Sequence, residues 1–282
     1  MYIYQKECEK YKMKSKITAF PYLIWMIIFI VVPLGMVVYF AVTDDAGRFT
    51  MANISRVGDY ASVIFRSLWL AAIATVICLV ASYPFAYIIS RKTEHQQRMM
   101  VMLVMLPMWM NFLLRTYAWM TLLEKNGLIN KLFGLIGLGP FNMINTQGAV
   151  ILGMVYNYIP YMILPLYTIM TKIDLRVIQA AQDLGANPLQ VFLKVVLPLT
   201  IPGITSGITM VFVPSLSTFI ISRMLGGGSN LLIGDLIDLQ FVGNTYNPNL
   251  GAAISLVLMV LILLCMSVFN QFGEEEEGGL LL

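Results

Sequence analysis

The chain has 282 residues, of which 59% are hydrophobic and only 12% charged, and its mean hydropathy is +0.78. Soluble domains are roughly half apolar and about a quarter charged. The apolar residues also fall into long runs, and too little polar surface remains to cover them in water. This composition excludes an ordinary soluble domain and predicts a membrane protein.

Six stretches of the chain are long and apolar enough to cross a membrane as helices, which need about 20 mostly apolar residues each. None alternates like a barrel strand, and in lipid only helices and closed barrels satisfy their own backbone hydrogen bonds. The predicted fold is therefore all-α, a polytopic membrane protein with about six transmembrane helices. The predicted spans are Ile17–Val42, Ser62–Ser90, Met99–Leu122, Gln147–Thr171, Leu199–Ile221 and Asn249–Phe272.

The spans lie between two terminal segments of different character. Residues 1–16 are basic, and the apolar run after them is too long for a signal peptide, so it is predicted to be an uncleaved first span. Residues 273–282 form an acidic, low-complexity tail that we expect to be disordered. The transmembrane domain is predicted to cover residues 17–272, including a cytoplasmic hairpin at residues 174–198.

Basic residues in short loops predict the orientation of the chain, because such loops are retained on the cytoplasmic side. Eleven lie in the N-terminal segment and in the loops after the second and fourth spans, against five on the opposite side. This distribution predicts that both termini are cytoplasmic. The eleven are Lys6, Lys10, Lys12, Lys14, Lys16, Arg91, Lys92, Arg98, Lys172, Arg176 and Lys194, and the five are Arg48, Arg56, Lys125, Lys131 and Arg223.

The segment between the fourth and fifth spans has the pattern of two short helices joined by a tight turn. Asp174 is a good N-cap for the first helix, and Gly185 stands where a helix end favours a left-handed residue. Asn187 then caps a second helix, with Pro188 in the favoured first position and a glutamine completing a capping-box spacing. We expect the second helix to end near Pro198, which opens the fifth span.

Two kinds of residue dominate the predicted surface of this hairpin. Small side chains around the turn allow another protein to approach closely, and an apolar face follows on the second helix. The residues alone fit either a docking surface for another protein or an amphipathic hairpin that rests on lipid headgroups. The small residues are Ala180, Ala181, Gly185 and Ala186, and the apolar ones are Val191, Phe192, Val195 and Val196.

The string IQAAQDLGANPLQVFLKVVLPLTIPGI, which begins at Ile178, resembles the EAA motif of ABC importer permeases, E-A-A, three residues and G, with a downstream L-P and P-G. The resemblance implies the type I importer permease architecture and a hairpin that inserts into a cleft of a cytoplasmic ATPase subunit. Gln179 stands where the family usually has glutamate, which removes the charge for an ion pair from this position. The residues implied to form the coupling loop are Gln179, Ala180, Ala181, Asp183, Leu184, Gly185, Ala186, Pro188, Phe192 and Pro198.

Over most of its length the chain is similar to the B-type permease subunits of spermidine/putrescine importers. The resemblance implies a non-catalytic half of a translocation pathway in a bacterial inner membrane. It also implies a homologous second permease, a dimer of ATPase subunits that bind ATP and Mg, and an external polyamine-binding protein. No cofactor and no nucleic acid are expected on this chain, which has no Walker motif. The matching stretches include YPFAYIISR (83–91), LPMWMNFLLRTYAWMTLLEKNGLIN (106–130), NYIPYMILPLY (157–167) and MLGGGSNLLIGDLI (224–237).

Polar and aromatic residues of the third and fourth spans are candidates for contact with a polyamine, because ammonium groups favour carbonyls, hydroxyls and aromatic faces. Asn111, Arg115 and Trp119 recur at four-residue spacing and are predicted to share one helix face. Arg115 repels a cation, so we expect it to pair with an acid of Glu124 or of a partner subunit, or to cap a helix, as a structural or gating charge. The candidate pathway residues are Trp109, Asn111, Tyr117, Tyr156, Tyr158 and Tyr161.

No aspartate or glutamate lies near the middle of a predicted span, so carboxylates for a polyamine inside the membrane must come mostly from the second permease. Two alternatives stay open. One is an ABC importer permease for another small solute, which Arg115 favours if that solute is an anion. The other, more remote, is a polytopic membrane enzyme, which needs buried acids, histidines or a metal cluster, whereas the sequence offers His95 and scattered loop acids.

Overall fold

The computed structural model describes residues 20–228, 230–243 and 246–279 of the chain. Within these ranges the secondary structure is helical, with no strand beyond one isolated bridge between Thr43 and Phe49. The all-α prediction is confirmed. The chain divides into two compact units, Met1–Asp59 with Leu239–Val257 and Tyr60–Asp238 with Leu258–Leu282.

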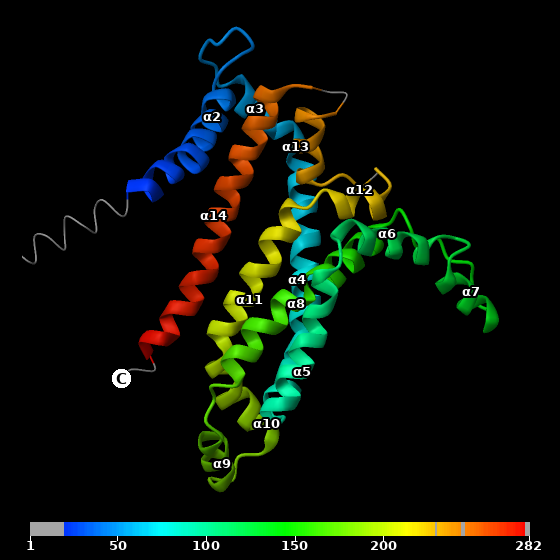
Figure 1. Cartoon of the computed structure of the whole chain (residues 1–282), viewed down its shortest axis with the longest axis vertical. Coiled ribbons are helices and arrows are strands. Elements are labelled where there is room, and N and C mark those ends of the chain that lie inside the picture. The colour runs from blue at the N-terminus through cyan, green and yellow to red at the C-terminus, as the bar shows by residue number, and fades with distance from the viewer. Residues whose placement is uncertain (1–19, 229, 244–245, 280–282) are drawn as a thin grey trace, which may run out of the picture. The chain divides into compact units, whose positions relative to one another are not determined.

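The second unit holds most of the helices, and two further helices, α13 and α14, contribute to both units (Figure 1). The bounds are α4 Ala61–Ser90, α5 Glu94–Met105, η3 Leu106–Trp109, α6 Phe112–Leu123, α7 Leu128–Leu135, α8 Gln147–Met170, α9 Leu175–Asp183, α10 Pro188–Val191, η4 Phe192–Val196, α11 Leu197–Ser217, α12 Ile220–Gly226, α13 Ile233–Phe241 and α14 Pro248–Gly279.

The first unit begins with an apolar helix and a polar loop. Asn53 donates its side-chain amide to the carbonyl of Thr43 at 2.8 Å, and Asn249 donates to the Asp45 carboxylate at 2.9 Å. The first bond ties the loop to α3, and the second ties it to the start of α14. Besides the end of α13 and the start of α14, the described helices of this unit are Phe20–Ala41, which includes η1 (Ile27–Val31) and α2 (Val32–Ala41), then α3 (Ala52–Val57) and the start of η2 (Gly58–Tyr60).

Five described helices have the length and hydropathy of membrane spans, and a sixth results if one strongly bent helix pair is counted as one span. The prediction of about six spans is therefore confirmed. The basic segment at residues 1–16 and the first three residues of the first predicted span lie outside the described ranges. The five helices are Phe20–Ala41, Ala52–Ser90, Gln147–Met170, Pro188–Ser217 and Pro248–Phe269.

The predicted third span, Met99–Leu122, is not one straight helix. The stretch of α5 and η3 is bent by 87° from the stretch of α6 and α7. Pro107 lacks a backbone N–H and lies in the tight turn η3, and Asn111, with ψ 129°, starts a new helix as its N-cap. The prediction that Asn111 shares a helix face with the arginine and tryptophan that follow it is wrong, because it stands at the bend. We call residues 105–116 the elbow.

The predicted fifth span extends too far at its C-terminal end. Helix α11 ends at Ser217, and Ile221 belongs to the separate helix α12. Thr218 between them has extended backbone, with φ −67° and ψ 142°. Gly234 packs so closely here that an added Cβ would lie 2.5 Å from the Ser217 carbonyl oxygen. The contact with α13 thus requires a glycine where the last carbonyls of α11 are exposed.

Helix α14 continues beyond the predicted sixth span as far as Gly279. It therefore includes the four glutamates 274–277, which lie in the tail predicted to be disordered. Glutamate favours helices, and four consecutive glutamates follow the single glycine at position 273. The prediction of disorder is wrong for this part of the tail, and residues 280–282 lie outside the described ranges.

Helices α4, α8 and α11 form the centre of the second unit. Within a bilayer, close van der Waals packing rather than burial from water holds helices together, and small residues allow it. Gly203 and Gly207 of α11 form such a contact with α8, since added Cβ atoms would lie 3.1 Å from the Pro165 carbonyl oxygen and 2.6 Å from the Met162 sulfur. The helices that carry the candidate site are therefore tightly packed against one another.

Candidate functional site

The hairpin predicted at residues 174–198 is present and joins the ends of α8 and α11 (Figure 1). The Asp174 side chain accepts a bond from a backbone N–H at 2.9 Å and caps α9. Asn187 and Gln190 form a reciprocal capping box at the start of α10, with bonds of 2.8 and 2.9 Å. These predicted caps are confirmed, and they satisfy backbone groups at both helix starts without help from other parts of the chain.

The turn of the hairpin depends on one glycine. Gly185 has φ +84°, the left-handed region that costs other residues steric strain. Its N–H bonds to the carbonyl of Gln182 at 2.9 Å, and the N–H of Ala186 bonds to the carbonyl of Ala181 at 3.1 Å. This pair of bonds is the Schellman arrangement for ending a helix. A Cβ at Gly185 meets nothing within 4 Å, so the backbone conformation alone requires glycine here.

A small apolar core holds the two hairpin helices together. Ile178, Val191 and Val196 are buried in it, and Ala181 and Ala186 pack against it. Two of the four small residues predicted to face a partner therefore support the inside of the hairpin instead. Their size still matters, because it lets the two short helices approach each other.

The second hairpin helix does not end near Pro198, contrary to prediction. Helices α10, η4 and α11 follow one another directly and form one helix over Pro188–Ser217. In the π-helical turn η4 the N–H of Leu197 bonds to the carbonyl of Phe192, five residues earlier. We attribute the uninterrupted helix to this wider turn, which accommodates a proline without an N–H. The hairpin is therefore a rigid extension of α11.

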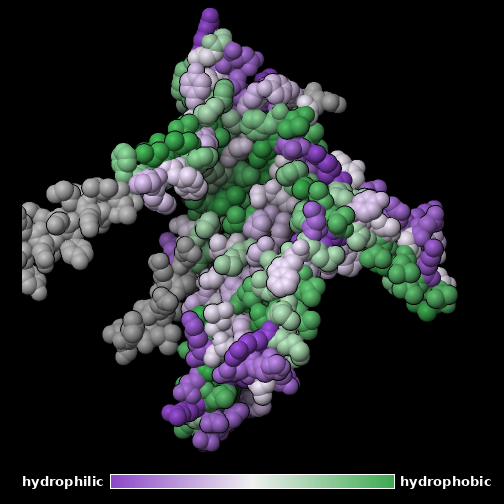
Figure 2. All heavy atoms as spheres, in the orientation of Figure 1, coloured by the Kyte–Doolittle hydropathy of each residue, from purple (hydrophilic) through white to green (hydrophobic). Residues whose placement is uncertain are grey.

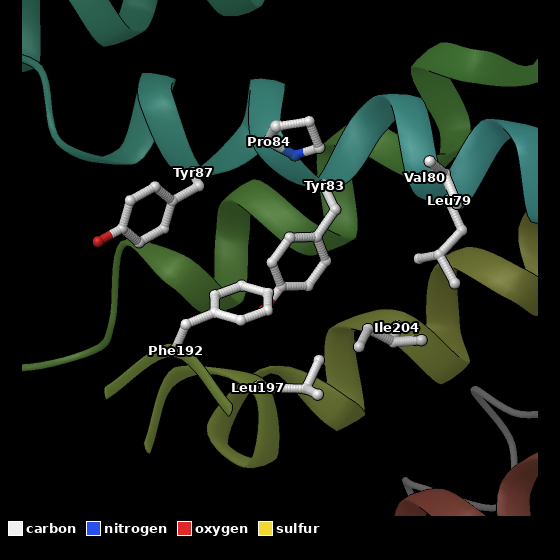
Figure 3. A pocket seen from close by; sticks show the side chains of 8 residues that line it. All are labelled: Leu79, Val80, Tyr83, Pro84, Tyr87, Phe192, Leu197 and Ile204. Carbon is white, nitrogen blue, oxygen red and sulfur yellow. The ribbon is translucent and has the colours of Figure 1, made fainter. Parts of the chain in front are cut away.

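An apolar groove of about 450 Å³ lies between α4 and this continuous helix (Figure 3). On its floor the rings of Tyr83 and Phe192 meet edge to face, with centroids 5.5 Å apart. The Tyr83 hydroxyl also forms a 2.8 Å hydrogen bond with Thr200 of α11. Nearby, the ring of Tyr87 packs against the hairpin core. The C-terminal half of α4 is thus a second connection between the hairpin and the spans.

The tip of the hairpin is exposed and hydrophilic residues gather around it (Figure 2). Leu184 is the most exposed of the large apolar side chains here, 89% exposed at the turn, and Leu189 is 65% exposed. An exposed leucine at a projecting turn is available for contact with another protein. Of the ten predicted coupling residues, Gln179, Ala180, Asp183, Leu184, Gly185 and Pro188 are exposed, and Ala181, Ala186, Phe192 and Pro198 are half-buried.

The structure separates the predicted pathway residues into two groups. Trp109 and Tyr117 are 75% and 55% exposed on the elbow and on α6. Asn111 is used locally, because its side chain accepts bonds from the N–H groups of Leu113 and Leu114 at 2.8 and 3.4 Å. These residues are not brought together around a cavity.

Among the candidate tyrosines of α8, Tyr156 lines two cavities. Tyr156 meets Trp119 edge to face at 5.3 Å, and both line an open apolar cavity of about 470 Å³. Tyr156 also borders a second cavity of about 300 Å³ between α5 and α8. Tyr158 is buried, its ring lies 6.4 Å from that of Tyr161, and its hydroxyl donates to the Pro214 carbonyl at 3.4 Å.

Arg115 is only 8% exposed, and its ring neighbour is Phe112, whose centroid lies 5.9 Å from the guanidinium carbon. Among the described residues no ion pair joins it to Glu124 or to any other acid. The sequence suggested Glu124 or an acid of a partner subunit for Arg115. The ion pair with Glu124 is not formed in the described part of the molecule.

A buried acid that the sequence prediction did not select lies at the start of α13. Asp235 is 1% exposed and accepts bonds from the Ser222 hydroxyl at 2.6 Å and the Leu232 N–H at 2.9 Å. Burial raises the pKa of its carboxyl above the usual range, although these hydrogen bonds and Arg223, 4.0 Å away, act in the opposite direction. Next to it the N–H of Ile233 donates to the Ser67 hydroxyl of α4. Spacing offered little signal, because only Leu232 is near Asp235 in the sequence, whereas Ser222 is 13 residues away and Ser67 is far from both.

Comparison with solved structures identifies proteins that have the same fold. Two solved structures share the fold, a bacterial ABC transporter involved in the import of the acidic polysaccharide alginate and a bacterial alginate ABC transporter in complex with alginate pentasaccharide-bound periplasmic protein. The first superposes with a TM-score of 0.79 at 14% identity, covering 98% of this chain and 99% of that chain. The second gives 0.77 at 16%, covering 95% and 96%.

Relatives found by sequence share a higher sequence identity with this chain than these two structures do. The spermidine/putrescine transport system permease protein PotB of Haemophilus influenzae is 38% identical over 270 residues, which cover 92% of this chain and 94% of the relative. The protein of the same name from Escherichia coli is 36% identical over 255 residues, covering 87% and 92%. Residues 96–273 also match the family described as binding-protein-dependent transport system inner membrane component. The hairpin lies inside this match, and the chain belongs to the family of binding-protein-dependent transport system inner membrane components.

Proposed function

We propose that this chain is a permease subunit of an ATP-driven spermidine/putrescine importer and forms half of its translocation pathway. The observation that carries the proposal is the 38% identity to a spermidine/putrescine permease over 92% of this chain. The capped hairpin at residues 174–198 supports the same assignment, because it offers an exposed tip that is rigidly joined to a span. The chain itself is non-catalytic, and ATP and Mg are bound by partner subunits.

The proposed coupling runs through two connections. An ATPase subunit receives the hairpin tip around Gly185, and closure of the ATPase dimer moves the hairpin. The unbroken helix Pro188–Ser217 carries that displacement along α11. The contact between Tyr83 and Phe192 carries it to α4, so that both helices change position together. Gln179 is exposed at the tip and contributes shape and hydrogen bonding, without a charge.

The assembly that this mechanism requires has further members. We assign a homologous second permease to the other half of the pathway and an external polyamine-binding protein to substrate capture. The basic residues of residues 1–16 and of the loops near the hairpin support cytoplasmic termini in a bacterial inner membrane. The buried and half-buried tyrosines of α8, with Trp119, are the proposed contacts for ammonium groups.

Uptake of labelled spermidine tests the proposal. A strain that lacks this chain is complemented with the wild-type gene, and initial uptake is measured with and without depletion of ATP. The proposal predicts ATP-dependent uptake that unlabelled putrescine inhibits. Uptake equal to that of the uncomplemented strain would remove polyamines as the substrate.

A second candidate is an importer of a small anion, and one observation favours it: a buried cationic side chain, Arg115, without an ion-pair partner in the described chain. The same strain distinguishes the two candidates. If spermidine uptake is absent, a panel of labelled small anions is tested under the same ATP dependence. An ATP-dependent signal for an anion assigns the chain to that class.

A further inference from the structure

Arg115 stands out among the buried polar side chains. Two of its guanidinium nitrogens, Nε and Nη1, are buried and have no hydrogen-bond partner among the described residues. The side chain is 8% exposed and lies within electrostatic range of the Tyr158 phenol. A guanidinium is always charged and presents five donors in a plane, so burial without an acceptor is costly.

The position of Arg115 in the elbow increases this cost. It lies in the first turn of α6, where its N–H bonds to the carbonyl of the N-cap Asn111 at 3.2 Å. The first turn is the positive end of the helix, which favours anions and disfavours cations. No acidic residue occupies this turn to balance the charge.

Asp235 shows what a buried charge with partners looks like in the same unit. Its Oδ2 accepts from a hydroxyl and a backbone N–H, while its Oδ1 has no hydrogen-bond partner among the described residues and lies 4.0 Å from Arg223. Every one of these groups belongs to this chain. Arg115 is 8% exposed against 1% for Asp235, and it has neither a hydrogen bond at Nε or Nη1 nor an ion pair among the described residues, so a partner on another molecule would supply what this chain does not.

The missing partner is an oxyanion, either a carboxylate of another protein or the phosphate of a lipid headgroup. Helices α4, α6, α8 and α11 contain no aspartate or glutamate, so this chain offers none from its central helices. The residues that flank Arg115 on the elbow are apolar and exposed, as in Trp109 at 75% and Leu114 at 65%. With only 8% of the arginine accessible, a single side-chain carboxylate on a closely packed helix fits the opening better than a bulky headgroup.

We propose that Arg115 forms an ion pair with a carboxylate of the second permease subunit, across the interface between the two. This inference rests on the proposed function only in requiring a second permease; it does not depend on the cargo. Arg115 then acts as a positioning residue that fixes the elbow of this chain against its partner. The expected contact is with Nη2, because Nε and Nη1 are the two nitrogens buried inside this chain.

The test uses the full transporter, purified through a tag on this chain, with recovery of the second permease as the readout. Arg115→Glu places like charges together and is expected to lower recovery by more than about ten-fold, and Arg115→Met, which leaves the partner acid unpaired, is expected to lower it less. The matched control is Arg98→Glu. Arg98 is 80% exposed in an ion pair with Glu94 of its own helix. Recovery of the second permease with this variant should therefore equal that with the wild type.

A charge-reversal screen identifies the partner. In the Arg115→Glu background, each aspartate and glutamate in the spans of the second permease is replaced by arginine in turn. The proposal predicts that one replacement restores recovery to within about two-fold of the wild type, since the reversed pair regains its attraction. It is overturned if Arg115→Met leaves recovery unchanged or if none of the reversals restores it.

Lipid phosphate is the remaining source of the oxyanion, and vesicle composition separates it from the protein carboxylate. The wild-type transporter is reconstituted in zwitterionic vesicles and in vesicles with added phosphatidylglycerol. Equal thermal stability in both, together with rescue by one reversal, supports the intersubunit pair. Stability that depends on the anionic lipid in the wild type and not in Arg115→Met would instead assign Arg115 to a headgroup. Neither result requires spermidine, so a failure here is distinct from a failure of the proposed cargo.

Discussion

The hairpin at residues 174–198 and the elbow at residues 105–116 are both bends in the chain, and they satisfy their polar groups in opposite ways. In the hairpin every cap comes from a side chain within three residues, and a glycine closes the turn. In the elbow Asn111 caps α6, but Arg115 is buried with two nitrogens unpaired. The hairpin is thus complete within its own sequence, whereas the elbow contains a buried charge that has no partner among the described residues.

This difference separates two roles in a transporter. A part that is pushed by an ATPase must keep its own shape, so local hydrogen bonds and a rigid helix are suited to it. A part that forms an interface can leave a group unsatisfied until assembly, because the partner supplies the missing contact. The predictions below test each half of this comparison, beginning with the largest expected effect.

Gly185→Val is expected to abolish most uptake. Valine in a left-handed conformation costs about 1–3 kcal/mol of strain, and the strain falls on the turn that we propose meets the ATPase. We expect spermidine uptake to fall by more than about ten-fold, because such an energy corresponds to a large change in the population of the intact turn. Gly137→Val is the matched control, since Gly137 has φ +75° and, like Gly185, open space around its Cβ position. Equal loss of uptake in both variants would show that backbone strain anywhere in the chain suffices.

Phe192→Ala tests the link between the hairpin and α4. The substitution removes a ring that meets Tyr83 at 5.5 Å, a contact worth about 0.5–1.5 kcal/mol beyond its buried area. Uptake should fall several-fold while the ATPase still co-purifies with the chain. Tyr83→Phe keeps the ring contact and loses only the hydrogen bond to Thr200, so its effect on uptake should be smaller. An equal or larger effect of Tyr83→Phe would contradict the assignment of the link to the ring contact.

The two asparagine caps provide the smallest effect and the closest comparison. Asn187→Ala and Asn111→Ala each remove an N-cap, which costs about 1 kcal/mol. Hydrogen-exchange mass spectrometry should show faster exchange in the first turns of α10 and α6, respectively. Asn→Asp at each position retains the acceptor and is the control. If Asn111→Ala leaves exchange in α6 unchanged, the bend is held by other contacts than its cap.

The sequence predicted the hairpin well because its signals act over very short distances. Asp174 caps a backbone group two residues away, and the box of Asn187 with Gln190 spans three residues. Such patterns are visible without knowledge of the tertiary structure. The second hairpin helix was predicted to end near Pro198 because proline is a strong helix breaker in general. The π-helical turn that accommodates this proline has no clear sequence signature.

The elbow and the buried charges could not be predicted for the opposite reason. The apolar run over residues 99–122 is continuous in hydropathy, and its 87° bend depends on where Pro107 and Asn111 stand relative to neighbouring helices. The contacts around Asp235 are equally invisible in the sequence. Ser222 is 13 residues away from Asp235, and Ser67 lies 166 residues from Ile233, whose N–H donates to its hydroxyl. Contacts of this kind arise only once the helices have packed.

Site-specific crosslinking of the hairpin tip to the ATPase subunit tests the central claim most directly. Leu184→Cys places a thiol at the exposed turn, and Leu135→Cys places one at a site of similar exposure on α7, 83% against 89%. In the assembled transporter, with the other reactive cysteines replaced, a short bifunctional reagent should join residue 184, and not residue 135, to the ATPase. No crosslink from residue 184, or an equal one from residue 135, would contradict coupling through this hairpin.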